Sequence, residues 1–74
     1  MRLETKGRGG KAVTVLFNIP LPLKDAVQLG KDLQQKLGVG GTFKDGCIEL
    51  RGDLRDKVEK TLVTQGIPIK RAGG

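Results

Sequence analysis

Along residues 11–19 of the chain, apolar residues recur at every second position from residue 13 onward. A period of two predicts a half-buried strand whose apolar side chains face the core. The segment before it, residues 7–10, holds three glycines and an arginine and is typical of a turn. We therefore expect residues 2–6 to form a short partner strand, which gives a hairpin with a glycine-rich, basic tip. The alternating apolar positions are Val13, Val15, Phe17 and Ile19.

The next segment has the apolar spacing of an amphipathic helix. Pro20 and Pro22 end the strand and introduce this helix, because the first turn does not need the N–H that proline lacks. Gly38 is expected to end it in the left-handed conformation. The apolar stripe consists of Leu23, Ala26, Val27, Gly30, Leu33 and Leu37, and the polar face carries Lys24, Lys31 and Lys36.

A second hairpin is predicted around Asp45 and Gly46, a strong two-residue turn signal. With that turn, directly opposed residues share a face of the sheet. The core side then carries Phe43, Ile48 and Leu50. The other face carries Cys47, Glu49 and Arg51.

The last part of the chain predicts a second helix and a final strand. Asp53 suits the N-cap position of the helix, and Gly66 closes it. Residues 67–70 are expected to form a short edge strand, since Pro68 cannot donate to a ladder, and residues 71–74 form a tail. The apolar stripe of the helix is Leu54, Val58 and Leu62.

These elements give the order (β)β-α-ββ-α-β within a single domain spanning residues 1–74. Two helices with apolar stripes bury one face of a mixed or antiparallel sheet, which predicts an α+β fold built as a two-layer sandwich. The chain has no His and one Cys, which excludes a His-based catalytic triad, a four-ligand zinc site and an internal disulfide. No apolar run is long enough to span a membrane, so we expect a cytoplasmic monomer.

The net charge of +6 favours a polyanionic partner, and much of this positive charge lies in one loop. Glycine lets backbone N–H groups approach a phosphate, and neighbouring cations neutralise it. A solvated hairpin turn remains the alternative interpretation of this loop. The basic loop consists of Lys6, Gly7, Arg8, Gly9, Gly10 and Lys11, and the helix lysines Lys24, Lys31 and Lys36 could extend its surface.

Catalysis and base stacking are both disfavoured by the positions of the candidate residues. Asp45 and Asp53 have structural explanations as a turn residue and a cap, so we expect no enzyme activity, cofactor or metal. Phe17 and Phe43 are both assigned to the core by alternation, which leaves no aromatic for an RNA base to stack on. We therefore expect recognition of folded RNA through backbone charge and shape.

Residues 38–55, which include the run from Gly40 to Asp53, resemble the signature of the SUI domain family. This is the eukaryotic-type translation initiation factor one family, which has bacterial and archaeal YciH-type members. Residues 5–11 are similar to its basic loop, and residues 70–74 look like the tail of the bacterial and archaeal members. The chain departs from the usual pattern at Val39, Phe43 and Arg51, and it lacks the N-terminal extension of many bacterial members.

The resemblance implies a compact α/β domain that binds the small ribosomal subunit, with its 16S-type rRNA, near the P site. It also implies a part in discriminating initiator tRNA and the start codon, with initiator tRNA and other initiation factors as further partners. Carried over to this sequence, contact with ribosomal RNA falls first on Arg8 and Lys11, then on Lys6. The first helix follows, with Lys24, Lys31 and Lys36.

Two alternatives stay open at this point. The terminal Gly73 and Gly74 are similar to the end of a ubiquitin-like modifier or sulfur carrier, although a β-grasp fold has one main helix and this chain predicts two. A general structured-RNA-binding domain without ribosome specificity would also fit the charge.

Overall fold

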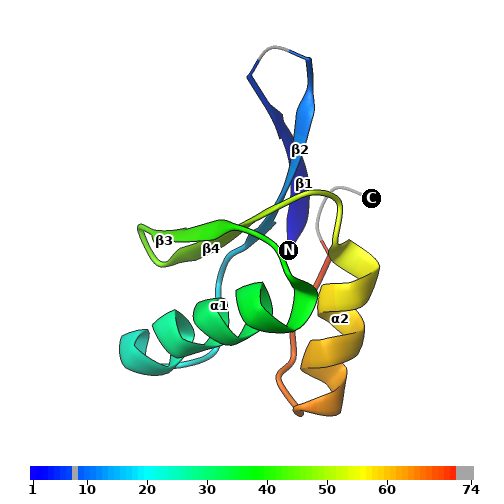
Figure 1. Ribbon diagram of the computed structural model, residues 1–74. Coiled ribbons are helices and arrows are strands. Elements are labelled where there is room, and N and C mark those ends of the chain that lie inside the picture. The colour runs from blue at the N-terminus through cyan, green and yellow to red at the C-terminus, as the bar shows by residue number, and fades with distance from the viewer. Residues whose placement is uncertain (8, 72–74) are drawn as a thin grey trace.

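The computed structural model describes residues 1–7 and 9–71, and it builds them around one four-stranded sheet (Figure 1). The strands lie in the order β1-β2-β4-β3, and each neighbouring pair is antiparallel. This confirms the predicted α+β fold and the order of its elements through the second helix. In chain order the elements are β1 (Arg2–Lys6), β2 (Lys11–Leu16), α1 (Leu23–Leu37), β3 (Gly41–Lys44), β4 (Cys47–Arg51) and α2 (Arg55–Thr64).

The hydrophobic core fills the space between one face of the sheet and the two helices. Ile48 and Leu50 of β4 are fully buried at its centre, as predicted, and Phe43 packs against them from β3. Burying one such side chain contributes about 1.5–3 kcal/mol, so this cluster is a main source of stability. The other buried members of the cluster are Met1, Leu16, Leu29, Leu33, Val58 and Leu62.

Helix α1 begins and ends at the residues that the sequence predicted. Pro22 occupies the N-cap with φ −56°, and Gly38 ends the helix in the left-handed conformation with φ 63°. Gly30 faces the sheet so closely that a Cβ there would lie 3.4 Å from Cγ1 of Ile48. The helix therefore lies directly on β4.

The side-chain phase predicted for β2 is wrong. The register pairs Thr14 with Leu50 and Leu16 with Ile48, so Thr14 and Leu16 face the core. Val13 and Val15 belong to the opposite face, where Val15 is nevertheless buried, with 2% of its surface exposed. Both sets of alternate positions in this strand contain apolar residues, and the polar Thr14 in its middle made the outward-facing set look like the core-facing one. Asn18 then turns the chain with φ 51°, and Ile19 packs against the core as expected.

The hydroxyl of Thr14 is buried, and it connects β2 to the start of α2. It donates a hydrogen bond to the carbonyl of Gly52 (2.7 Å) and accepts one from the N–H of Leu54 (2.8 Å). The prediction that Asp53 caps this helix is wrong, because Leu54 is the N-cap residue and no side chain caps the helix locally. The hydroxyl of a threonine distant in sequence thus forms hydrogen bonds at the start of the helix, where a local N-cap side chain was expected to form them.

The C-terminal segment packs on the core, but it does not extend the sheet. Residues 67–70 are not assigned to a strand, which corrects the predicted final element. Pro68 has no N–H to donate, and the segment is held instead by individual bonds. The N–H of Ile67 donates to the carbonyl of Leu62 (2.9 Å), and the amino group of Met1 donates to the carbonyl of Lys70 (2.6 Å).

The predicted tail is described only at its first residue. The guanidinium of Arg71 pairs with the carboxylates of Asp56 and of Glu59 on α2, the latter at 2.7 Å. The remainder of that prediction, residues 72–74 with the terminal diglycine, lies outside the described residues.

Replacing Thr14 by Val should lower the free energy of unfolding by about 1–3 kcal/mol, because an isosteric methyl leaves the Gly52 carbonyl and the Leu54 N–H buried without their partner. Thr14→Ser is the matched control, since it keeps the hydroxyl and loses one methyl, which costs about 1 kcal/mol. Urea denaturation of the three proteins measures the difference. A valine variant as stable as the parent would show that the buried hydroxyl does not hold this junction.

Candidate nucleic-acid interface

The β1–β2 hairpin carries the basic loop, and Figure 1 shows its tip projecting away from both helices. Strand pairing ends at Lys6 opposite Lys11, so the loop spans residues 7–10. Gly7, Gly9 and Gly10 have φ values of 75°, 88° and 63°, a region that L side chains rarely adopt. Glycine at these three positions therefore allows the backbone conformation of the turn without strain. Arg8, the first of the predicted contact residues, lies outside the described residues.

The loop is open on the sides where its glycines would bear a side chain. A Cβ added at Gly7, Gly9 or Gly10 would meet no atom within 4 Å, and all three residues are exposed. The backbone of the loop is thus accessible to a large partner such as an RNA helix. Exposed backbone N–H groups and nearby cations are the two features that phosphate contact requires.

Two lysine positions face each other at the base of the loop. Lys6 pairs with Lys11 in the register, and Lys11 is exposed. Like charges at directly opposed positions of an antiparallel pair are destabilising. The backbone register therefore places two lysines at opposed positions at the base of the loop, where a bound anion would offset their repulsion.

The lysines of α1 do not form a single stripe. Lys24 and Lys31 are exposed and seven residues apart, so they lie one above the other on the same side of the helix. Lys36 falls instead on the stripe that contains Asp25 and Asp32. Since two carboxylates accompany Lys36, it contributes less to a basic surface than the sequence suggested.

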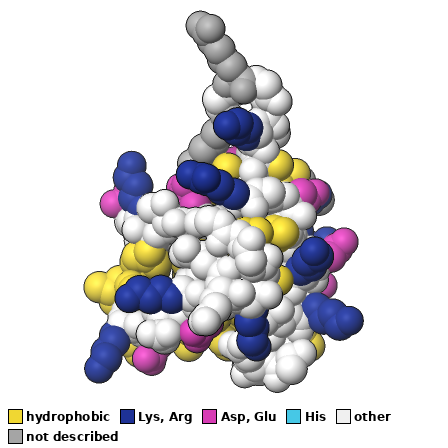
Figure 2. Space-filling model, in the orientation of Figure 1, with side chains coloured by type: hydrophobic (Ala, Val, Ile, Leu, Met, Phe, Trp, Pro, Cys, Tyr) yellow, Lys and Arg dark blue, Asp and Glu magenta, His cyan; other side chains and the backbone are white. Residues whose placement is uncertain are grey.

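The basic loop and the α1 lysines lie at different ends of the molecule. The loop sits at the hairpin tip, whereas α1 lies on the far side of β3 and β4 (Figure 1). The described chain is elongated, with a longest extent of 34 Å. Lysine and arginine side chains are scattered between the two ends, interspersed with a few acidic residues (Figure 2). The structure therefore presents two separate basic regions and does not join them into one patch.

An aromatic side chain that the sequence assigned to the core is accessible instead. Phe17 directly follows β2 and is half-buried, and the guanidinium carbon of Arg2 lies 5.2 Å from its ring centroid. Arg2 also pairs with Glu4 at 2.8 Å. The prediction that both phenylalanines are core residues is confirmed for Phe43 and wrong for Phe17. One sequence signal could have warned against assigning Phe17 to the core. The polar Thr14 among the apolar residues of β2 leaves open which alternate positions face inward.

The acidic residues considered for catalysis have structural partners. Asp45 forms the predicted β3–β4 turn with φ 51°. Asp53 accepts a hydrogen bond from Arg55 at 3.0 Å, and this bond lowers the pKa of its carboxyl. Among the described residues, no cluster of three His, Cys, Asp or Glu side chains could hold a metal ion. No helix in that part of the chain is both long enough and apolar enough to cross a membrane.

Comparison with known proteins agrees with this geometry. The family model described as "Translation initiation factor SUI1" matches residues 1–68. The chain belongs to the SUI1 family. The resemblance found in residues 38–55 is therefore confirmed, and the SUI1 match includes both hairpins and both helices.

Relatives of this SUI1 chain occur in bacteria and archaea. It is 39% identical over 71 residues to "Uncharacterized protein YciH" of Escherichia coli, covering 96% of this chain and 66% of that protein. It is 41% identical over 68 residues to "Protein translation factor SUI1 homolog" of Ignicoccus hospitalis, covering 92% and 64%. For the protein of that name from Pyrococcus furiosus the identity is 43% over 61 residues, covering 82% and 62%. The chain thus spans slightly less than two thirds of the length of these relatives.

Replacing Lys11 by Glu should raise the free energy of unfolding by about 0.2–1 kcal/mol, because an opposite-charge pair replaces a like-charge pair at the base of the loop. Lys11→Gln, which removes the charge without reversing it, should fall between the two. Thermal unfolding at low salt measures this order. If the Glu variant is the least stable of the three, the paired lysines carry no cost and the argument for an anion at this position fails.

Proposed function

We propose that this chain acts in translation initiation by binding the small ribosomal subunit near the P site. Through that position it contributes to discrimination of initiator tRNA and the start codon, and other initiation factors are further partners. The observation that carries the proposal is the family match over residues 1–68, which coincides with a projecting, cationic, glycine-rich loop. The protein works by binding, without a reaction or cofactor of its own, in the cytoplasm where ribosomes initiate.

The basic loop is the proposed main contact with the 16S-type rRNA. Its glycine backbone lies close to phosphate groups, while Arg8 and Lys11, followed by Lys6, neutralise them. Lys24 and Lys31 of α1 contact a second part of the RNA, because they lie away from the hairpin tip. Lys36 has a smaller part, since Asp25 and Asp32 share its stripe. Phosphate contacts of this kind fix the position of the protein and carry no base sequence information.

Two structural features speak against the modifier alternative. A ubiquitin-like fold has one main helix, whereas this chain has the 15-residue α1 and the 10-residue α2. The SUI1 match also covers nearly all of the described chain. A general RNA-binding role is the second candidate, because the paired lysines at the loop would attract any structured RNA.

Replacing Arg8 and Lys11 together by Ala should weaken binding to small ribosomal subunits and flatten its dependence on salt. Each lost phosphate contact removes about 0.7–0.9 from the slope of log K against log salt concentration. Co-sedimentation with purified 30S subunits across a salt series measures both quantities.

The matched control is Lys57→Ala with Lys60→Ala, which removes the same charge from exposed positions on α2. The control should change binding much less than the loop variant. Equal losses in the two double variants would mean that only net charge matters, and an unchanged loop variant would remove the loop from the interface. Equal competition by an unrelated structured RNA would favour the general RNA-binding candidate.

A further inference from the structure

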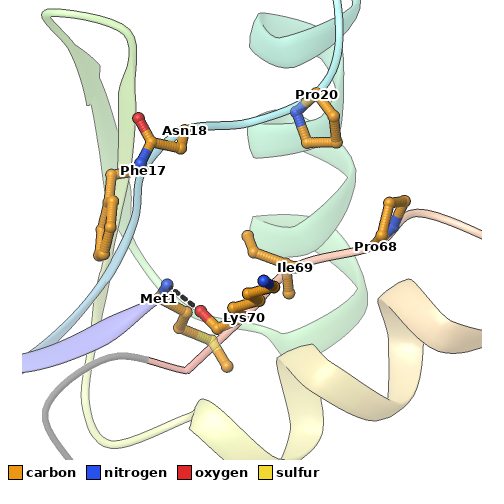
Figure 3. Close-up of a pocket in the computed structure, with 7 residues that line it drawn as sticks. All are labelled: Met1, Phe17, Asn18, Pro20, Pro68, Ile69 and Lys70. Carbon is orange, nitrogen blue, oxygen red and sulfur yellow. Dashed lines mark hydrogen bonds between the residues drawn. The ribbon is translucent and has the colours of Figure 1, made fainter.

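A small pocket lies at the base of the hairpin, on the side away from its basic loop. Its walls come from two distant segments, the connection that follows β2 and the C-terminal segment, and the pocket volume is about 260 Å³. Figure 3 shows Phe17 and Asn18 on one side and the C-terminal segment on the other, with Met1 between them. The lining residues are Met1, Phe17, Asn18, Pro20, Pro68, Ile69 and Lys70.

Both walls of this pocket are held in place by contacts that their own residues or close neighbours make. The amino group of Met1 donates to the Lys70 carbonyl at 2.6 Å, which joins the first strand to the C-terminal segment. Ile19 and Ile69, one next to each wall, pack against the hydrophobic core. The pocket is therefore largely preformed, and its volume lies just below the range of roughly 300–1,000 Å³ that is typical of small-molecule sites. It suits one small planar group.

The chemistry of the lining combines flat apolar surfaces with positive charge. The ring of Phe17 and the rings of Pro20 and Pro68 supply apolar surface, and Asn18 adds a side-chain amide at the rim. Among the described residues that line the pocket, Lys70 carries the one charged side chain and none carries a carboxylate. Arg2 adds a second cation 5.2 Å from the Phe17 ring.

We propose that this pocket binds one unpaired base of a single-stranded RNA segment, stacked on Phe17, with Lys70 and Arg2 neutralising the flanking phosphates. Aromatic platforms beside cationic side chains are the combination that binds single-stranded nucleic acid, because every base has a face that can stack. The amide of Asn18 offers both a donor and an acceptor to a base edge.

The pocket and the basic loop belong to the same hairpin but do different work. Arg2 pairs with Val15 at the base of the hairpin, whereas Lys6 pairs with Lys11 at its tip. The loop contacts phosphates of folded RNA, and the pocket adds contact with a base. The inference rests on the proposed function for its partner, RNA, but it can fail while ribosome binding through the loop persists.

The test compares two fluorescein-labelled single-stranded RNA decamers of equal charge, one of mixed sequence and one in which the central residues are abasic. The complete 74-residue chain should bind the mixed decamer more tightly. Phe17→Leu should reduce its affinity for that decamer roughly five- to a hundredfold, the range expected for one stacked base, and leave the abasic decamer unaffected. Phe17→Trp, which keeps an aromatic platform, should retain most of the affinity.

Nuclear magnetic resonance keeps the test decisive if the leucine variant unfolds. Titrating the parent chain with the mixed decamer should shift the Phe17 ring and Met1 methyl signals, whereas the abasic decamer should leave them in place. Equal affinity for both decamers with unmoved Phe17 signals would overturn the proposal. Displacement of the mixed decamer by an acidic, aromatic-rich peptide that shifts the same signals more strongly would also overturn it, in favour of a protein ligand. If Phe17→Leu still binds 30S subunits, either of these results contradicts the pocket proposal alone and leaves the proposed function standing.

Discussion

The buried hydroxyl of Thr14 determines how the hairpin is attached to the rest of the molecule. It bonds the carbonyl of Gly52 and the N–H of Leu54, the two groups that flank the entrance to α2. Among the described residues, no buried side-chain nitrogen or oxygen lacks a partner. Because β2 is one strand of the projecting hairpin, these two bonds and the pairing of β2 with β4 together anchor the hairpin to the rest of the fold. Leu16, which lies two residues further along β2 on the same face, packs in the core between the sheet and the helices.

This attachment separates the surfaces that serve recognition from those that serve folding. One face of the sheet is covered by the core, so the hairpin tip and the outer side of α1 are the exposed surfaces that a partner could contact. The acidic residues that could have suggested chemistry are tied to a turn and to Arg55. What the chain offers is charge, accessible backbone and one aromatic ring. These features support the proposed contact with RNA.

The sequence predicted the elements with strong local signals. The proline-to-glycine boundaries of α1 and the Asp45–Gly46 turn depend on backbone geometry within a few residues, and all were found in place. The phase of β2 could not be predicted, because it depends on a tertiary hydrogen bond from Thr14 across 38 and 40 residues. For the same reason Asp53 was mistaken for the cap. The final strand was predicted but does not form, because Pro68 cannot donate to a ladder and the segment is held by the Met1 contact instead.

The same distinction between local sequence signals and tertiary contacts applies to the candidate site. The basic loop could be found in the sequence because its glycines and cations are neighbours in the chain. The pocket joins Phe17 to Lys70 and exists only in the folded chain.

The central claim of the proposed function is that the hairpin tip contacts small-subunit rRNA. Hydroxyl-radical cleavage from a tethered iron chelate tests this contact. The chelate is placed on Thr5→Cys in a Cys47→Ser background, with Val63→Cys on α2 as the reference. We predict strong cleavage of rRNA near the P site from position 5. Absence of cleavage, or stronger cleavage from position 63, would contradict the account.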